Sequence, residues 1–219
     1  DMPLGASEIE AIERELVERN ALDEGGVYIQ PGRGAADRDF AFPKQVAPSL
    51  VMFTQAKKLI DNPAAEKGLS VITLPDIRWQ RRDIKTVQLL AASLAKQAAL
   101  DAGSDDAWLV ENGFVTEGTS NNAHIVRDGR LITRPLSNEI LHGITRRAML
   151  RLAQTDGVGI EERPFTVAEA QAADEAFITS AMTFVLPVVK IDGKPVGTGR
   201  PGPVTGHLRA LYIEEAQKA

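Results

Sequence analysis

Apolar positions along the chain follow a helical spacing in some stretches and strand-like runs in others. Ser7 opens a capping-box pattern, and the spacing of three and four residues that follows predicts a helix to about Asn20. The same spacing predicts helices over 144–155 and 167–175, and another that closes the chain from residue 203 onward. These helices are separated by strand-like segments.

Runs rich in β-branched and apolar residues predict strands at 25–31, 49–56 and 69–77. The second and third of these runs are apolar enough to be buried on both faces, and a turn-forming segment separates them. Short strands joined by Asn-Gly and Asp-Gly turns follow over 107–135, and a further hairpin is predicted over 176–197.

Strands and helices are mixed without a regular β-α-β period, which indicates an α/β or α+β fold with irregular strand order and a meander or barrel-like sheet. The sequence contains no internal repeat and no Ser- or Pro-rich linker. With 219 residues, of which 43% are hydrophobic, the chain is large enough to bury a substantial core as one domain or two.

Charge and residue usage exclude several classes of partner. The formal net charge of -5 is distributed without a basic block, so nucleic acid is not an expected partner. Apolar runs are too short for a membrane span, and no signal-peptide pattern opens the sequence. The chain has no cysteine, and its three histidines lack ligand spacing, so we expect no metal site. These features indicate a soluble, cytoplasmic protein.

The stretch QRRDIKTVQLLAASLAKQAAL, residues 80–100, places Lys85 directly before a helical pattern, with Asp83 or Thr86 as the expected N-cap. A cation at a helix start is disfavoured by roughly 0.3 to 1 kcal/mol. Lys85 is either a solvated loop lysine or a nucleophilic amine. In the second case, desolvation, the helix N-terminus, and the neighbouring Arg81 and Arg82 would lower its pKa.

Glu117, in VTEGTSNN, has two interpretations as well. It belongs to a turn with a charged rim, or it is buried and needs a cationic partner such as a protonated ring nitrogen.

Two segments could bind an anion. Residues 143–145 open a predicted helix, where free N–H groups and a hydroxyl could hold a phosphate, and residues 179–181 form a small-residue strand end. Taken alone, both segments are better explained by ordinary capping.

Two other motifs are rejected. GTGRPG, residues 197–202, matches the glycine pattern of dinucleotide sites, but it lies near the C-terminus without a following strand. A serine hydrolase is not supported either, because the G-x-S-x-G pattern is absent.

Several motifs, in order along nearly the whole chain, resemble the class IV pyridoxal-phosphate aminotransferases. That family includes D-amino-acid, branched-chain and (R)-amine transaminases and aminodeoxychorismate lyase. The motifs are DIRWQRRDIKTVQLLAASLAKQ, NGFVTEGTSNNAHIV, LHGITRRAML, ITSAMTFVLPV and IDGKPVGTGRPGPVT. Their order makes the resemblance more specific than any single motif.

The resemblance implies a fold-type IV enzyme with pyridoxal 5'-phosphate as cofactor. Lys85 would be the Schiff-base lysine and proton carrier, and Glu117 would pair with the pyridine nitrogen. Family members often have threonine where this chain has Ala181, so only the backbone could contribute there. The phosphate would be held by Ile144, Thr145, Ser180 and the Ala181 N–H, with Arg78 in an indirect role near the cofactor.

The segment YIQPGRGAADRDFAFP resembles the substrate loop of D-amino-acid aminotransferases. Arg38 matches an arginine that clamps the substrate carboxylate, whereas Phe40 stands where histidine is common. The resemblance therefore implies ping-pong transamination of D-amino acids with a 2-oxo acid such as 2-oxoglutarate. Branched-chain aminotransferase and aminodeoxychorismate lyase are the alternatives among enzymes, and an inactive scaffold or fragment is the alternative outside them.

The resemblance also implies a domain organisation. Residues 1–79 would form the C-terminal part of a small domain and the inter-domain segment, and residues 80–219 would form the large cofactor-binding domain. The family's small N-terminal domain, which precedes the first predicted helix, is expected to be missing from this sequence, and a homodimer is expected.

Overall fold

The computed structural model describes residues 2–218. Contacts divide the chain into two compact units, one up to Leu59 and the other from Ile60. The division lies earlier than the family-based boundary after residue 79, because the strand at 69–75 pairs within the sheet of the second unit. The assignment of residues 1–79 to a small domain and its linker stays a prediction.

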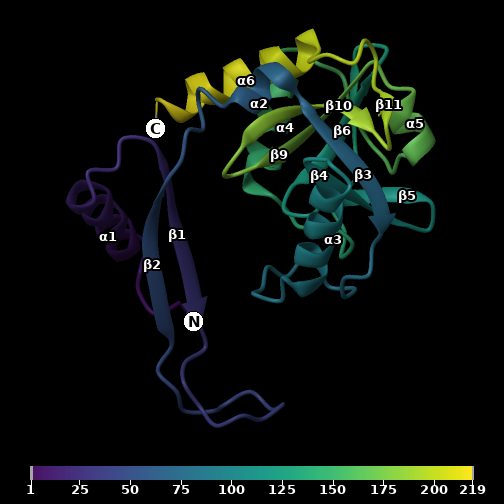
Figure 1. Cartoon of the computed structure of the whole chain (residues 1–219). Coiled ribbons are helices and arrows are strands. Elements are labelled where there is room, and N and C mark those ends of the chain that lie inside the picture. The colour runs from purple at the N-terminus through teal and green to yellow at the C-terminus, as the bar shows by residue number, and fades with distance from the viewer. Residues whose placement is uncertain (1, 219) are drawn as a thin grey trace. The chain divides into compact units, whose positions relative to one another are not determined.

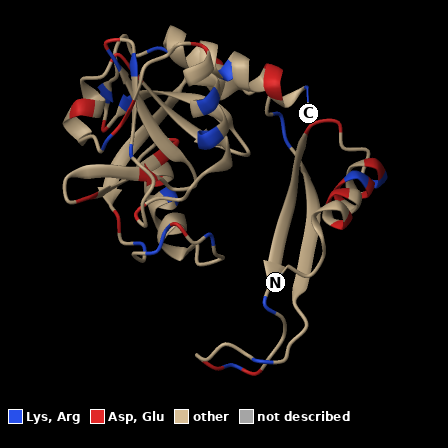
Figure 2. Ribbon diagram, turned by 180° about the vertical axis from the view of Figure 1, so that it is seen from behind, with Lys and Arg blue, Asp and Glu red and all other residues tan. Residues whose placement is uncertain are grey.

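The first unit combines one helix with a two-stranded sheet (Figure 1). Helix α1, Ala6–Arg19, lies against the antiparallel strands β1, Gly25–Gly32, and β2, Ser49–Ala56. The expected N-cap at Ser7 is wrong by two positions. Gly5 is the N-cap, and its N–H donates to the Glu8 carboxylate over 2.8 Å. Acidic and basic residues are interspersed along α1 (Figure 2).

Burial on both faces, expected for the run at 49–56, is wrong for β2. Its residues alternate between half-buried and exposed positions, and Val51 and Phe53 remain 52% and 42% exposed. Phe53 stacks on Tyr28 of β1, with ring centroids 4.7 Å apart. One face of this hairpin therefore carries exposed apolar side chains.

The second unit is built on a mixed sheet whose strand order is β5-β4-β3-β10-β9-β6-β7-β8, with β11 paired to β10. Strands β3 and β4, β3 and β10, and β7 and β8 run parallel, whereas the other pairs are antiparallel. The strands are β3 Leu69–Pro75, β4 Asp106–Glu111, β5 Phe114–Gly118, β6 Asn122–Arg127, β7 Arg130–Thr133, β8 Ile160–Glu162, β9 Glu175–Ser180, β10 Phe184–Ile191 and β11 Lys194–Pro195.

The two ends of this sheet approach each other. Phe114 of β5 forms a bridge with Thr166, which follows β8, and the Val115 N–H donates to the Phe165 carbonyl over 3.0 Å. These contacts curl the sheet, so the barrel-like architecture expected from the sequence is confirmed. Trp108 and Phe165 meet edge to face in the enclosed core, with ring centroids 6.1 Å apart.

The Asn-Gly and Asp-Gly turns also form as expected. Asn112 and Gly113 have φ angles of 52° and 83°, and Asp128 and Gly129 have φ angles of 51° and 71°. Two successive positive φ angles are typical of the tight turn that matches the twist of a hairpin.

Helices cover the curled sheet on two sides (Figure 1). Helix α3, Leu90–Asp101, packs on β3 and β4, whereas α4, Ile144–Thr155, and α6, Pro203–Ala216, pack on each other and on β9. The short helices are α2 Pro63–Lys67 and α5 Val167–Gln171. Within residues 2–218, no helix has both the length and the apolar character needed to cross a membrane.

Candidate functional site

Glu117 lies near the end of β5 and is only 3% exposed. Its Oε1 accepts a hydrogen bond from Arg78 Nη1 over 2.5 Å. Its Oε2 accepts from Asn122 Nδ2 and from the Leu141 N–H, each over 3.0 Å. Glu117 is thus the buried carboxylate of the second interpretation, and a guanidinium is its cationic partner.

The hydrogen bonds that Glu117 accepts favour its ionised form and leave it room for one more donor. Burial raises the pKa of Glu117 above its usual range, and the Arg78 guanidinium opposes that shift. A carboxylate offers about four acceptor positions, and the contacts above occupy three of them. Oε1 therefore retains capacity for a further N–H donor.

Arg78 follows β3 and is anchored by Asp76, whose side chain is fully buried. Arg78 donates to Asp76 from its backbone N–H over 3.1 Å, from Nε over 3.0 Å and from Nη2 over 2.7 Å. Arg82 lies behind this pair, with its Nε 3.5 Å from the Asp76 carboxylate and its Nη1 2.9 Å from Glu111. Arg78, assigned only an indirect role from the sequence, directly contacts Glu117.

Asn122, at the start of β6, is a site residue that the sequence analysis did not identify. Its Nδ2 donates to Glu117 and also to the Leu141 carbonyl over 2.9 Å. Its Oδ1 lies against Gly143, where an added Cβ would be only 2.2 Å away. In the sequence, the signal that could have identified Asn122 is the pair of asparagines at 121 and 122. The two have different partners, because Asn121 donates to Asp106 and not to Glu117. Asn122 connects the carboxylate to the start of α4.

The start of α4 has the features of an anion site. Gly143 is its N-cap, and the first N–H groups of a helix lack partners within the helix. Thr145 is 2% exposed, and its buried Oγ1 has no hydrogen-bond partner among the described residues. The side chain of Ile144 has no hydrogen-bonding group, so its contribution to such a site would come from the backbone. A phosphate here would satisfy both the N–H groups and the hydroxyl.

Ser180 and Ala181 lie where β9 turns into β10. Ser180 Oγ and Thr183 Oγ1 share a hydrogen bond of 2.7 Å, and Ala181 is exposed. Thr179 is the register partner of Asn122, which faces Gly143. The strand register therefore brings Ser180 to the same end of the sheet as the start of α4.

Lys85 lies in an exposed loop, and the helix begins later than expected. Helix α3 starts at Leu90 with Leu89 as its N-cap, so the predicted caps are wrong. The cationic neighbours are also paired: Arg81 contacts Asp83 over 2.8 Å, and Arg82 contacts Glu111. Within the described part of the chain, the Lys85 side chain has no hydrogen bond or ion pair. The residue is exposed.

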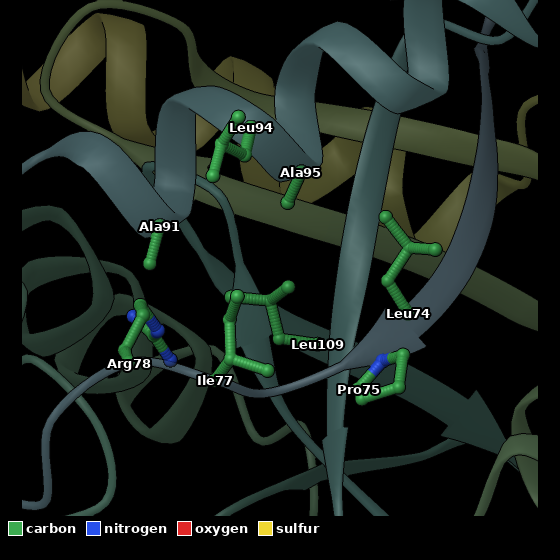
Figure 3. A pocket seen from close by; sticks show the side chains of 8 residues that line it. All are labelled: Leu74, Pro75, Ile77, Arg78, Ala91, Leu94, Ala95 and Leu109. Carbon is green, nitrogen blue, oxygen red and sulfur yellow. The ribbon is translucent and has the colours of Figure 1, made fainter.

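A hollow of about 200 Å³ lies between α3 and the sheet (Figure 3). Leu94 and Ala95 of α3 face Ile77 and Leu109 across it, and Arg78 is its charged lining residue. Neither Lys85 nor Glu117 lines this apolar hollow. Arg78 therefore lines the hollow on one side and contacts the buried carboxylates of Asp76 and Glu117 on the other.

Arg38 and Phe40 belong to the first unit, in the loop between β1 and β2. The Arg38 guanidinium lies 5.5 Å from the centroid of the Phe40 ring, which is 92% exposed. A guanidinium at this distance from an aromatic face makes a cation-π contact. Both side chains are accessible within their own unit.

Comparison with solved structures identifies the architecture. A branched-chain amino acid aminotransferase from T.th., complexed with N-(5'-phosphopyridoxyl)-L-glutamate, is 30% identical, with a TM-score of 0.83, covering 98% of this chain and 72% of that one. The buried carboxylate with one acceptor position left, and the unpaired Thr145 hydroxyl at a helix start, fit the ring nitrogen and phosphate of pyridoxal 5'-phosphate. The fold is that of a fold-type IV pyridoxal-phosphate enzyme.

Sequence comparison defines the family. The model of amino-transferase class IV matches residues 1–191. The D-alanine aminotransferase of Staphylococcus aureus (strain COL) is 38% identical over 220 residues, covering 98% of this chain and 77% of that protein. The D-alanine aminotransferase of Bacillus licheniformis is 38% identical over 211 residues, covering 95% and 74%. The chain belongs to the class IV aminotransferases, and its cofactor is pyridoxal 5'-phosphate.

Proposed function

We propose that this aminotransferase transfers the amino group of D-amino acids to a 2-oxo acid, such as 2-oxoglutarate, in a ping-pong reaction. The observation that carries the substrate class is the 38% identity to proteins named D-alanine aminotransferase, over 98% of this chain. D-alanine is therefore the first amino donor to test.

The proposed roles of the site residues rest on the resemblance to the family and are compatible with the chemistry of their side chains. Bound pyridoxal phosphate supplies an aldehyde that condenses with amines and a ring that accepts electrons from the substrate α-carbon. The amine of Lys85, an exposed residue, would hold the cofactor and carry the proton that leaves the substrate α-carbon. Glu117 would pair with the ring nitrogen through its remaining acceptor position. The phosphate would be held by backbone N–H groups, including those of Ile144 and Ala181, and by the hydroxyls of Thr145 and Ser180.

Arg38 is proposed to bind the substrate carboxylate. Its guanidinium offers a fork of donors that matches a carboxylate, and its side chain is accessible. Phe40 offers no hydrogen-bond donor from its side chain, so it would present an aromatic surface to the substrate. Arg38→Ala should therefore raise KM for the amino acid more than it lowers kcat.

An amino-donor panel on the yellow holoprotein tests the substrate class. We expect D-alanine to be active and L-leucine to be a poor donor, with 2-oxoglutarate as acceptor. Activity with L-leucine and none with D-alanine would instead support a branched-chain aminotransferase. Pyruvate release from aminodeoxychorismate would indicate the lyase. A colourless preparation that takes up no pyridoxal phosphate would support the inactive-scaffold alternative.

A homodimer is also part of the proposal. The segment before α3 and the first turns of that helix expose large apolar side chains: Ile77, Val87, Leu89, Leu90 and Leu94. Large exposed apolar side chains concentrated in one segment favour an interface with another chain. Light scattering should give twice the chain mass, and Leu90→Glu should shift it towards the mass of one chain. A cytoplasmic location, expected from the sequence, completes the proposal.

A further inference from the structure

We propose that Arg78, anchored on Asp76, is a positioning residue that holds Glu117 as a carboxylate aimed at the cofactor ring. This inference rests on the proposed role of Glu117 as the partner of the ring nitrogen. It makes the indirect role of Arg78 specific: Arg78 orients Glu117 and keeps it ionised.

The anchoring of Arg78 is asymmetric. Three of its N–H groups, at the backbone, Nε and Nη2, bond to Asp76, whereas Nη1 bonds to Glu117. Asp76 is itself held by the Thr116 hydroxyl over 2.7 Å. Although burial raises the pKa of Asp76, the Arg78 guanidinium and this hydroxyl hold that pKa below its usual range. Asp76 is thus a fixed anion against which the guanidinium is oriented.

The planar guanidinium then determines where Glu117 can point. One edge of the fork, Nε and Nη2, faces Asp76, so Nη1 is directed at Glu117 Oε1. Asn122 and the Leu141 N–H hold the other oxygen. The carboxylate is therefore fixed at both oxygens, and its orientation does not depend on the presence of the ring. A lysine ammonium at position 78 would keep the charge but could not reproduce this fork.

The charge of Arg78 also opposes protonation of Glu117. Burial alone favours the neutral acid, and Asp76, as a nearby like charge, acts in the same direction. Arg78 is the cation in direct contact with Glu117, whereas Arg82 lies behind it, between Asp76 and Glu111. A protonated Glu117 would no longer stabilise a protonated ring nitrogen, so the contact matters for the chemistry as well as for folding.

The test measures the side-chain carboxyl of Glu117 by ¹³C NMR over a pH series, in the cofactor-free protein. Glu117→Gln assigns the signal by its disappearance. Arg78→Gln and Arg78→Lys are compared with wild type. Arg163→Gln is the matched control, because Arg163 also pairs with a carboxylate two residues away, Glu161, and its ion pairs among the described residues do not include Glu117 or Asp76. The same variants are then loaded with pyridoxal phosphate, and the visible absorbance of the holoprotein is followed against pH.

Arg78→Gln should raise the pKa of Glu117 by about one to three units, the usual effect of losing an adjacent opposite charge. Arg78→Lys should raise the pKa of Glu117 less but should still weaken cofactor binding. If Arg78→Gln does not fold, the Arg78→Lys protein provides the test of the inference. The pH profile of the absorbance should move with the carboxyl pKa. Arg163→Gln should change neither quantity.

An unchanged Glu117 pKa in Arg78→Gln would overturn the inference, as would an Arg78→Lys protein that matches wild type in both the carboxyl pKa and cofactor affinity. The two proposals fail in different ways. A protein that shows the carboxyl shift but takes up no pyridoxal phosphate would contradict the proposed function while supporting the link between Arg78 and Glu117.

Discussion

Gly143 and Asn122 are in such close contact that a Cβ at Gly143 would lie 2.2 Å from Asn122 Oδ1. The φ and ψ angles of Gly143, -60° and 132°, are accessible to any residue, so the need for glycine here is steric. The contact joins the helix start that is proposed to hold the phosphate to the amide that holds Glu117.

Gly143→Ala should displace the Asn122 side chain and disturb its hydrogen bond to Glu117. We expect a loss of about 1 to 3 kcal/mol in the free energy of unfolding, typical of overpacking, together with weaker cofactor binding. Gly206→Ala is the matched control, because Gly206 lies in α6 with no atom near the added methyl. It should stabilise the fold by about 0.5 to 1 kcal/mol. Equal effects of the two changes on cofactor affinity would contradict this account.

Thr145→Val should act in opposite directions on the cofactor-free and loaded protein. The buried hydroxyl lacks a partner within the described residues, so its removal should stabilise the cofactor-free fold, by up to about 1 to 2 kcal/mol. Loss of a hydrogen bond to the phosphate should raise the dissociation constant of the cofactor by roughly 10- to 100-fold. Thr155→Val, at the exposed end of the same helix, should change neither the stability of the cofactor-free fold nor the affinity for the cofactor. Calorimetry measures the stability of the cofactor-free fold, and a fluorescence titration measures cofactor affinity. Unaltered cofactor affinity in Thr145→Val would contradict the assignment of Thr145 to the phosphate site.

His124 should make the fold less stable in mild acid. It is fully buried, it stacks on Phe177 with ring centroids 4.8 Å apart, and its Nε2 shares a hydrogen bond of 2.9 Å with Thr179. Burial, and secondarily the charge of Arg146, lower its pKa well below 6.5. Below about pH 6.5 the unfolded chain therefore binds a proton that the folded chain does not, and stability falls as pH falls, by about 1.4 kcal/mol per unit.

The variant His124→Phe removes this titration and keeps an aromatic ring beside Phe177. Its free energy of unfolding should lose the part of the pH dependence between about 6.5 and 5 that His124 contributes. His207→Gln, which changes an exposed histidine paired with Asp156, serves as the comparison. Urea denaturation at a series of pH values measures both. A wild-type pH slope in His124→Phe would show that another group is responsible.

Asp76→Asn should be strongly destabilising, because it leaves Arg78 and Arg82 next to an uncharged amide in a buried network. Removing one partner of a buried ion pair typically costs about 3 to 5 kcal/mol. Glu161→Gln breaks a half-exposed pair with Arg163 and should cost less than about 1 kcal/mol. If both changes have similarly small effects on the midpoint of urea denaturation, the Asp76 network does not stabilise the fold as described.

The extent to which sequence predicts this molecule varies between elements. The spacing of apolar residues gave the bounds of α4, and the Asn-Gly and Asp-Gly pairs gave the hairpin turns, because in both cases the determining interactions are local. The start of α3 was placed too early, because Val87 continues the apolar spacing although it lies in a loop, 63% exposed. The spacing of apolar residues shows which positions are apolar, but it does not show which of them will be buried.

The predicted site was limited in a similar way. Glu117 and Arg78 are far apart in the sequence and meet only because the strand before Arg78, β3, pairs with β4, and β4 with β5. Asn122 was missed because an asparagine after a turn is ordinarily a turn residue, and its contacts with Glu117 and Gly143 depend on the same strand order. Contacts that depend on the order of the strands in a sheet can be identified only once the structure is known.

The most direct test of the proposed site is chemical attachment of the cofactor. Borohydride reduction of the yellow holoprotein, followed by peptide mass spectrometry, identifies the amine that binds pyridoxal phosphate. Lys85→Ala is the negative variant, and Lys96→Ala, in α3, is the matched control. We predict a single phosphopyridoxyl label on Lys85, lost in Lys85→Ala and retained in Lys96→Ala. A label on a different lysine, or undiminished labelling and turnover in Lys85→Ala, would contradict the account.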